Sequence, residues 1–183
     1  RRVLKEIEHV GPVIAAGGSL LCDRQGHTLH RKLLVDAVVA ATTEVLLERD
    51  LRVLVLKDGD ACGLDYVLVG DAPLHPASIW WFADHGVRLA EVPMISDDPC
   101  PGQTIRVGAV ADAGCLAEPA QMLAASLGDQ ARVQHWPAVT SSEATGSATH
   151  LLEIFEPTVN KWSMLRWVLP ETFRERITFE LGI

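Results

Sequence analysis

Apolar residues recur along this chain in two patterns, one typical of helices and one typical of short buried strands. Between Thr28 and Arg49 they follow one another at three- and four-residue steps, which predicts a helix with one apolar stripe. The runs at 53–56 and 66–69 are short and continuously apolar, and Asp and Gly residues follow each of them. This pattern is expected of strands that are buried on both faces of a sheet.

Further elements of both kinds alternate along the rest of the chain. Strands are expected at 13–16, 19–21, 87–92, 105–110 and 132–136, and helices at 76–85 and 118–127, each closed by a Gly. Residues 96–104 are rich in Asp, Pro and Gly and predict a domain boundary or a mobile loop, 140–149 predicts a loop, and the tail 151–183 predicts strand-like pieces around Trp162 and Trp167. We therefore expect a single α/β domain over residues 1–183. It would be three-layer-like, with a mostly parallel or mixed sheet and a Trp-containing C-terminal tail.

Composition narrows the class of protein. The chain has 183 residues, 48% of them hydrophobic, and a formal net charge of -8. This apolar fraction excludes disorder, and the absence of a run of about 18 apolar residues argues against a membrane-spanning helix. The acidic balance argues against duplex nucleic acid and anionic membranes as partners. The four cysteines are scattered along the chain, so reduced thiols and a cytoplasmic location are expected.

Acidic residues gather where the expected strands end, which suggests a metal site. Asp58 and Asp60 follow one strand, and Asp71 follows the next. If the sheet were parallel, these carboxylates would meet at one edge, where ligands bind in open α/β sheets, and could hold a magnesium ion. The alternative is ordinary turn chemistry, since Asp and Gly end strands whatever the function, and it is the favoured interpretation.

Several titratable residues flank the same expected edge. The candidate catalytic residues are His27, His30, His75 and Asp84. His27 and His30 lie three residues apart at the expected helix start and would share a face, although solvated helix-cap groups are the simpler interpretation. Gly17-Gly18 either permits the approach of a phosphate or another backbone, or forms a bulge, and the bulge is favoured.

The segment His75-Pro76-Ala77-Ser78, with Phe82 and Gly86-Val87-Arg88 after it, resembles the acetyl-CoA-dependent N-acetyltransferase superfamily over residues 75–89. The resemblance implies acyl transfer, with a phosphorylated cofactor near the turn at 25–34. Gly26, Thr28 and Arg31 are the candidate cofactor-binding residues there. Two features depart from the family: Phe82 stands where the family has a Tyr, and Thr28 and His30 replace glycines of its pyrophosphate loop.

Three functions remain open from the sequence. The first is a small-molecule transferase, of acyl-CoA-dependent type if the resemblance holds. The second is a non-catalytic oligomerisation or protein-partner-binding domain that acts through Trp80 or Trp81 and residues 162–169, because aromatic residues are enriched in interface cores. The third is a magnesium-assisted phosphoryl-transfer or hydrolytic enzyme that uses the Asp residues. The cofactor stays unknown, and the expected partners are a small-molecule ligand, another protein or a second copy of the chain.

Overall fold

The computed structural model describes residues 11–138 and 149–169, which belong to two compact units. The larger unit comprises residues 32–157, and the smaller unit combines residues 1–31 with residues 158–183. The segment 96–104, expected to be a boundary or mobile loop, lies inside the larger unit. That residues 1–183 form one domain stays a prediction.

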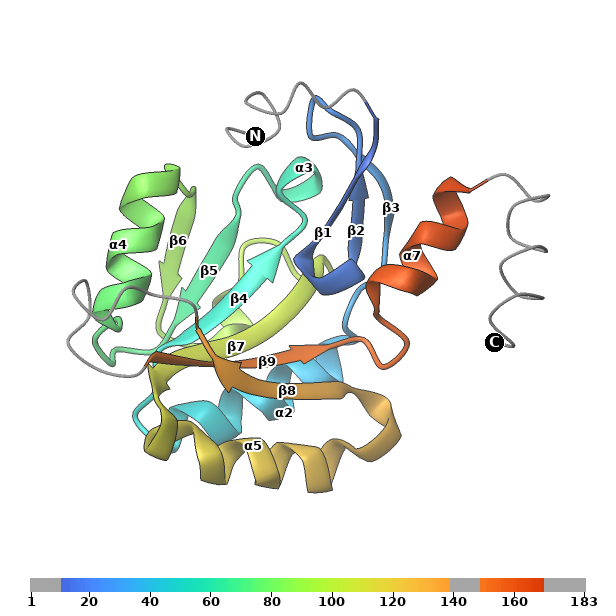
Figure 1. The fold of residues 1–183 in the computed structure, drawn as a ribbon. Helices are drawn as coiled ribbons and strands as arrows, with labels where there is room; N and C mark the ends of the chain where they lie inside the picture. The colour runs from blue at the N-terminus through green and yellow to red at the C-terminus, as the bar shows by residue number, and fades with distance from the viewer. Residues whose placement is uncertain (1–10, 139–148, 170–183) are drawn as a thin grey trace. The chain divides into compact units, whose positions relative to one another are not determined.

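A six-stranded sheet forms the larger unit, with strand order β6-β5-β4-β7-β9-β8 (Figure 1). The strands are β4 (Val53–Lys57), β5 (Tyr66–Val69), β6 (Leu89–Val92), β7 (Thr104–Asp112), β8 (Arg132–Pro137) and β9 (Thr149–Phe155). The helices are α2 (Asp36–Leu47), α3 (Gly59–Cys62), α4 (Pro76–His85) and α5 (Ala113–Leu127), with short 3-10 turns η2 (Ile95–Asp97) and η3 (Gly128–Gln130). β5 and β6 run parallel, whereas the other neighbouring strands pair antiparallel. The α/β class and a mixed sheet are thus confirmed, but the mostly parallel arrangement is wrong.

Helices cover both faces of this sheet, which gives the larger unit three layers. On one face, α2 and α5 bury the main core, in which Val53, Val55 and Val107 pack with helix residues such as Leu46 and Leu123. On the other face, Phe82 of α4 packs on Tyr66 and Leu68 of β5. Because successive strand residues point to opposite faces, β4 and β5 contribute to both layers, as their continuous apolar runs predicted.

The expected helix at 28–49 is correct only in its second part. Residues Thr28–Arg31 form strand β3, and α2 begins at Asp36. Over those four residues, half-buried and exposed side chains alternate, and the backbone pairs with residues 20–22. This period of two decides for a strand, whereas the helix prediction rested on the stronger apolar stripe further along.

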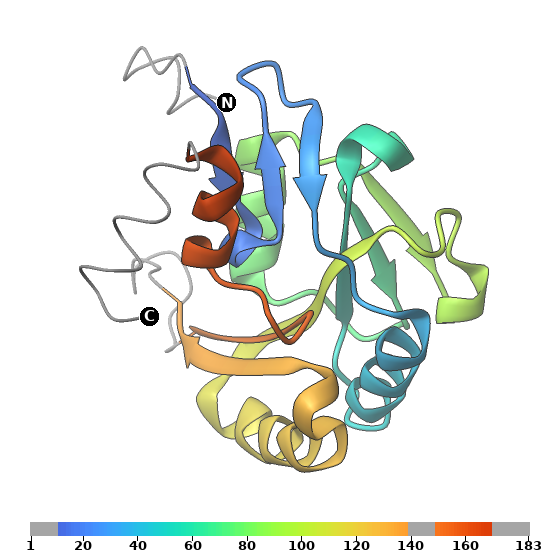
Figure 2. The ribbon, with the colours of Figure 1, turned by 90° about the vertical axis from the view of Figure 1, so that its right-hand side faces the viewer.

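Three short antiparallel strands and one helix make up the described part of the smaller unit (Figure 2). They are β1 (Val13–Ala15), β2 (Leu20–Cys22), β3 (Thr28–Arg31) and α7 (Lys161–Val168), with the 3-10 turn η1 (Ala16–Gly18) between β1 and β2. The tail was expected to be strand-like, but α7 is a helix. Asn160 and Ser163 form a reciprocal capping box at its start, in which each side chain accepts a hydrogen bond from the other residue's backbone N–H.

Gly17 and Gly18 allow another backbone to approach, and they do not form the favoured bulge. Gly18 is buried with φ of 110°, and a Cβ atom there would lie 2.6 Å from the backbone nitrogen of Lys161. The chain needs glycine here for both reasons, since a side chain would clash and an L residue would be strained. The close approach fixes η1 against the first turn of α7.

No helix within residues 11–138 and 149–169 is long and apolar enough to cross a membrane. Most of the loop expected at 140–149 and the end of the tail, residues 170–183, lie outside the described residues.

Candidate functional site

A pocket of about 350 Å³ opens on the face of the larger unit's sheet that α4 partly covers. Its volume is within the range of small-molecule sites. Side chains from α4, from five strands and from Ala138, which directly follows β8, line it: Leu54, Tyr66, Ala77, Ser78, Trp80, Trp81, Phe82, Arg106, Val110, Trp136, Ala138, Thr149, Leu151 and Glu153. Aromatic and aliphatic groups dominate this lining, and a few polar groups lie among them.

An ion pair between two neighbouring strands forms the polar part of the pocket. Arg106 of β7 donates through Nη1 to Glu153 Oε1 of β9 and through Nη2 to the Tyr66 hydroxyl, at 2.7 Å. Trp136 of β8 donates its indole N–H to the other oxygen of Glu153, at 2.9 Å. Burial lowers the pKa of Arg106, but Tyr66 and Glu153 outweigh that effect, so the net shift is upward. Arg106 therefore stays charged, and its charge is matched by Glu153.

Three indole side chains around the pocket are exposed. Trp80, Trp81 and Trp136 have 52%, 38% and 48% of their surface exposed. The Trp81 ring is held by an edge-on contact with Tyr66, with ring centroids 6.1 Å apart, and by stacking on His85 at 4.9 Å. Burial of large aromatic side chains is a main driving force of folding, so exposure of three around one pocket indicates a binding surface.

Two hydroxyl groups in the pocket lack hydrogen-bond partners among the described residues. They are Ser78 Oγ on α4 and Thr149 Oγ1 on β9, and both residues are buried. A buried hydroxyl without a partner costs about 1–3 kcal/mol, and native proteins usually satisfy such groups. Both hydroxyls are therefore candidate hydrogen-bond partners for a ligand in this pocket.

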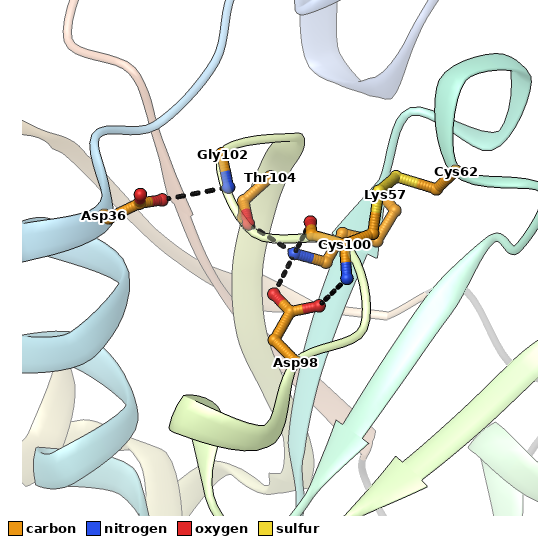
Figure 3. Close-up of polar contacts among 7 residues, drawn as sticks. All are labelled: Asp36, Lys57, Cys62, Asp98, Cys100, Gly102 and Thr104. Carbon is orange, nitrogen blue, oxygen red and sulfur yellow. Dashed lines mark hydrogen bonds and ion pairs between the residues drawn. A yellow bond between two sulfur atoms is a disulfide. The ribbon is translucent and has the colours of Figure 1, made fainter.

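A second polar cluster, around the buried Lys57, is structural. Lys57 donates to Asp98, to the carbonyl oxygen of Cys100 at 3.1 Å and to Thr104 Oγ1 at 2.8 Å (Figure 3). Asp98 also accepts from the backbone N–H of Cys100 at 2.9 Å. All three ammonium protons of Lys57 can thus be satisfied within the protein, which leaves none for a substrate.

The same loop carries a disulfide, which corrects the expectation of reduced thiols. Cys62 of α3 is bonded to Cys100, whereas Cys22 and Cys115 form no disulfide. Because 38 residues separate Cys62 from Cys100, the sequence spacing gave no signal for this pairing. The segment expected to be mobile is instead held by the disulfide, by Lys57 and by a hydrogen bond from Gly102 to Asp36 (Figure 3).

The structure does not bring the candidate metal ligands together. Asp58 is buried and caps α3 by accepting from the amide of Asp60, which is exposed. Since β4 and β5 are antiparallel, with Val53 opposite Val69, Asp71 follows β5 at the other end of the sheet from Asp58. Among the residues that the structure describes, no group of three His, Cys, Asp or Glu side chains could hold a metal ion. The expected convergence of Asp58, Asp60 and Asp71 was therefore wrong, because it assumed a parallel sheet.

The candidate catalytic residues lie in different places. In the smaller unit, His27 lies in the turn before β3 and contacts Asp23 at 2.9 Å, while His30 stacks on Trp167 with ring centroids 3.9 Å apart. Burial raises the pKa of Asp23, but hydrogen bonds from the ring and amide of His27 and the amide of Gly26, together with the charge of His27, give a net lowering. The shared helix face expected for His27 and His30 was wrong because no helix forms there.

In the larger unit, His75 and Asp84 lie at opposite ends of α4. His75 caps the helix by accepting from the amide of Ala77, and its Nε2 lies 3.9 Å from Asp112. Asp84 is exposed beside His85, at 3.5 Å. A catalytic role for these two residues, and for His27 and His30, stays a prediction.

The candidate cofactor residues belong to one hairpin of the smaller unit. Gly26 is in the turn, with φ of 96°, and donates to Asp23, while Thr28 and Arg31 are on β3. Their binding role stays a prediction.

Sequence reasoning missed the polar residues of the pocket, although a signal was present. Arg106 and Glu153 each interrupt an apolar strand, in Ile105-Arg106-Val107 and Leu152-Glu153-Ile154. A charged residue inside a buried strand requires an oppositely charged partner nearby. Arg106 therefore predicts a buried carboxylate, and Glu153 predicts a buried cation. The strand order that makes them neighbours was not available from the sequence.

No family model matches this chain, and no curated protein matches it. Several solved structures share its fold. A haloacid dehalogenase-like hydrolase from Bacteroides thetaiotaomicron matches with a TM-score of 0.67 and 17% identity, covering 92% of this chain and 57% of that one. A haloacid dehalogenase-like hydrolase from B. subtilis matches with a TM-score of 0.61 and 11% identity, covering 100% and 62%. A phosphatase of the haloalkanoate (HAD) enzyme superfamily from Bacteroides thetaiotaomicron matches with a TM-score of 0.58 and 13% identity, covering 89% and 53%.

These similarities establish the fold and correct the transferase assignment. The chain has the α/β fold found in HAD-like hydrolases, and it spans a little over half the length of the structures that it matches. Residues 76–85 form a helix that is closed by Gly86, and strand β6 begins at Leu89. That connection is common in α/β proteins, and the solved structures with a similar fold are described as hydrolases and phosphatases, so the transferase assignment was wrong.

Proposed function

We propose that this chain acts in the hydrolysis of phosphate esters, and that the pocket of the larger unit binds the organic group of the substrate. The observation that carries the proposal is the fold shared with HAD-like hydrolases and phosphatases over nine-tenths of the chain. The chain spans only part of the length of those proteins, and its own residues would carry out both substrate binding and ester hydrolysis. The magnesium ligands expected at Asp58, Asp60 and Asp71 form no part of the proposal.

The polarity of the pocket supports its assignment to the organic group of the substrate. Arg106 and Glu153 neutralise each other, so the described lining offers no unmatched charge to a phosphate group. Its aromatic and aliphatic walls fit an uncharged organic group. A phosphate group requires a positively charged site.

Within the smaller unit, taken by itself, the first turn of α7 is a candidate site for an anion. Lys161 is exposed at the start of this helix, and the first turn contains no acidic residue. The positive end of the helix dipole and the Lys161 ammonium therefore add to each other, which favours an anion. In the same unit, Ser19 Oγ is fully buried without a partner among the described residues.

Phosphate release tests the proposal. The purified chain is incubated with p-nitrophenyl phosphate, adenosine monophosphate and glucose 6-phosphate, with and without magnesium, and free phosphate is measured. We expect release from at least one ester, and a lower kcat/KM in Lys161→Ala. Arg166→Ala is the matched control, because it removes a cation from the last turn of the same helix. A folded chain that releases no phosphate from any ester contradicts the proposal.

A partner-binding function is the second candidate, and the exposed residues of α4 favour it. Ile79 and Trp80 are both more than half exposed on this short helix. Sedimentation at several protein concentrations separates the two functions, since a homo-oligomer would show a mass that depends on concentration. The cytoplasmic location expected from the sequence stays a proposal, and the Cys62–Cys100 disulfide argues against it, because disulfides are typical of oxidising compartments. Thiol labelling in fresh extracts would decide it.

A further inference from the structure

The pocket of the larger unit combines aromatic walls with very few free polar groups. Glu153 accepts from Arg106 and Trp136, and Arg106 donates to Glu153 and Tyr66, so the strongest polar groups are engaged with one another. Among the buried polar atoms of the described lining, the hydroxyls of Ser78 and Thr149 have no partner, and the exposed Trp80 and Trp81 add indole N–H donors. A ligand would therefore meet large apolar ring surfaces, two neutral hydroxyls that can each donate or accept a hydrogen bond, and indole N–H groups that can only donate.

This combination discriminates between ligand classes. A sugar ring presents hydroxyls around its whole edge, and most of them would be left without partners in this pocket, at a cost for each. A flat heteroaromatic ring has two large faces that stack on aromatic side chains and only a few polar edge atoms. Two hydroxyls are sufficient for such an edge.

The aromatic walls are already positioned for stacking. Trp136 is fixed by its hydrogen bond to Glu153, and Trp81 is fixed by Tyr66, Phe82 and His85. Rings held in place before binding lose little conformational entropy when a ligand arrives. Trp80, at 52% exposure, supplies a third indole at the pocket.

We propose that this pocket binds a flat, uncharged heteroaromatic ring, such as a nucleobase, stacked on the indoles and hydrogen-bonded at its edge by Ser78 and Thr149. This inference rests on the proposed function, because the ring would belong to the organic group of the phosphate ester. It assigns to the pocket a ligand class that the fold alone does not specify.

Binding of unphosphorylated nucleosides tests this inference separately from catalysis. Tryptophan fluorescence is recorded while the chain is titrated with adenosine, guanosine, cytidine, uridine and riboflavin, and with methyl glucoside as the sugar. Stacking on indole quenches its emission, so at least one heteroaromatic compound should give saturable quenching, and methyl glucoside should not bind. The inference is overturned if none of the five compounds binds, or if the sugar binds in their place.

Two pairs of variants locate the binding. Trp80→Ala should weaken the affinity by about 5- to 150-fold, the range for loss of one stacked aromatic ring. Trp167→Ala, which removes an exposed indole of the smaller unit, should leave it unchanged. Thr149→Val should weaken the affinity by about 2- to 12-fold, the effect of one hydrogen bond. Thr43→Val, which removes a buried hydroxyl that also lacks a described partner but lies on α2, should not.

The thermal stability of the same variants separates a binding role from a structural one. Because Thr149 Oγ1 has no described partner, Thr149→Val should keep or raise the melting temperature while it weakens binding. A lower melting temperature with unchanged affinity would show that the hydroxyl is structural and would overturn its assignment. Nucleoside binding without phosphate release supports the ring site and contradicts the proposed function, whereas phosphate release without nucleoside binding does the reverse.

Discussion

Removal of the negative charge of Asp98 tests the account of the buried Lys57 cluster. The Lys57 side chain is 0% exposed and that of Asp98 is 6% exposed, so neither charge is solvated by water. In Asp98→Asn the ammonium keeps two neutral acceptors, the Cys100 carbonyl and Thr104 Oγ1, but it loses its counter-charge. Breaking a buried pair in this way costs about 3–5 kcal/mol, and the two remaining hydrogen bonds favour the lower end.

The expected loss is therefore about 3 kcal/mol in the free energy of unfolding. In a protein of this size each kcal/mol lowers the melting temperature by about 2–4 °C, which gives a decrease of about 6–12 °C. Urea denaturation followed by circular dichroism measures the free energy directly, in a non-reducing buffer that keeps Cys62–Cys100 intact. Glu91→Gln is the matched control. It removes one partner of the Arg52–Glu91 ion pair, whose carboxylate side chain is 68% exposed, and should cost less than about 1 kcal/mol.

A double variant sharpens the result. Lys57→Met combined with Asp98→Leu removes both charges and should cost much less than the sum of the two single variants, because no uncompensated charge remains. If Asp98→Asn costs no more than Glu91→Gln, the buried ion pair does not stabilise the loop and the reasoning is wrong.

Three further predictions concern other parts of the chain. Gly18→Ala should lower the melting temperature of the chain, since its Cβ would clash with the backbone at Lys161, whereas Gly102→Ala, where φ is also positive but the space is open, should cost less. Burial and the charge of His150 both lower the pKa of His135 in the folded chain. Between this lowered pKa and the ordinary value of about 6.5, the unfolded chain therefore binds more protons than the folded chain. The stability that His135 contributes above about pH 6.5 is lost as the pH falls through the folded pKa. His150→Gln should raise the pKa of His135 in an NMR titration, and an unchanged pKa would contradict the coupling. Lys161→Ala should reduce phosphate-ester turnover while adenosine affinity stays the same, and equal losses in both would argue against a separate phosphate site.

The sequence predicted the elements that depend on local chemistry. The helices closed by Gly86 and Gly128, and the buried strands β4 and β5, are confirmed because their signals lie within a few residues. The start of α2 was wrong because the apolar stripe masked the short alternation of β3. The helix α7 was missed although Asn160 and Ser163 have the spacing of a capping box.

Features that depend on strand order could not be predicted in this way. Whether Asp58 and Asp71 meet is decided by the direction of β5 relative to β4, and a run of apolar residues is the same in both directions. The pairing of Arg106 with Glu153 depends on β7 and β9 being neighbours. The candidate site is therefore largely a product of topology, and from the sequence only the Trp80-Trp81 pair and the charged residues within two apolar strands pointed to it.

The indole N–H resonances give the most direct test of the central claim that the larger unit's pocket binds a ring-containing ligand. The five tryptophans give five such signals, assigned by single Trp→Phe variants. On addition of the nucleoside that quenches fluorescence most, the account predicts shifts for Trp80, Trp81 and Trp136, which line the pocket, and none for Trp162 and Trp167. Shifts confined to Trp162 and Trp167, or no shifts at saturating nucleoside, would contradict it.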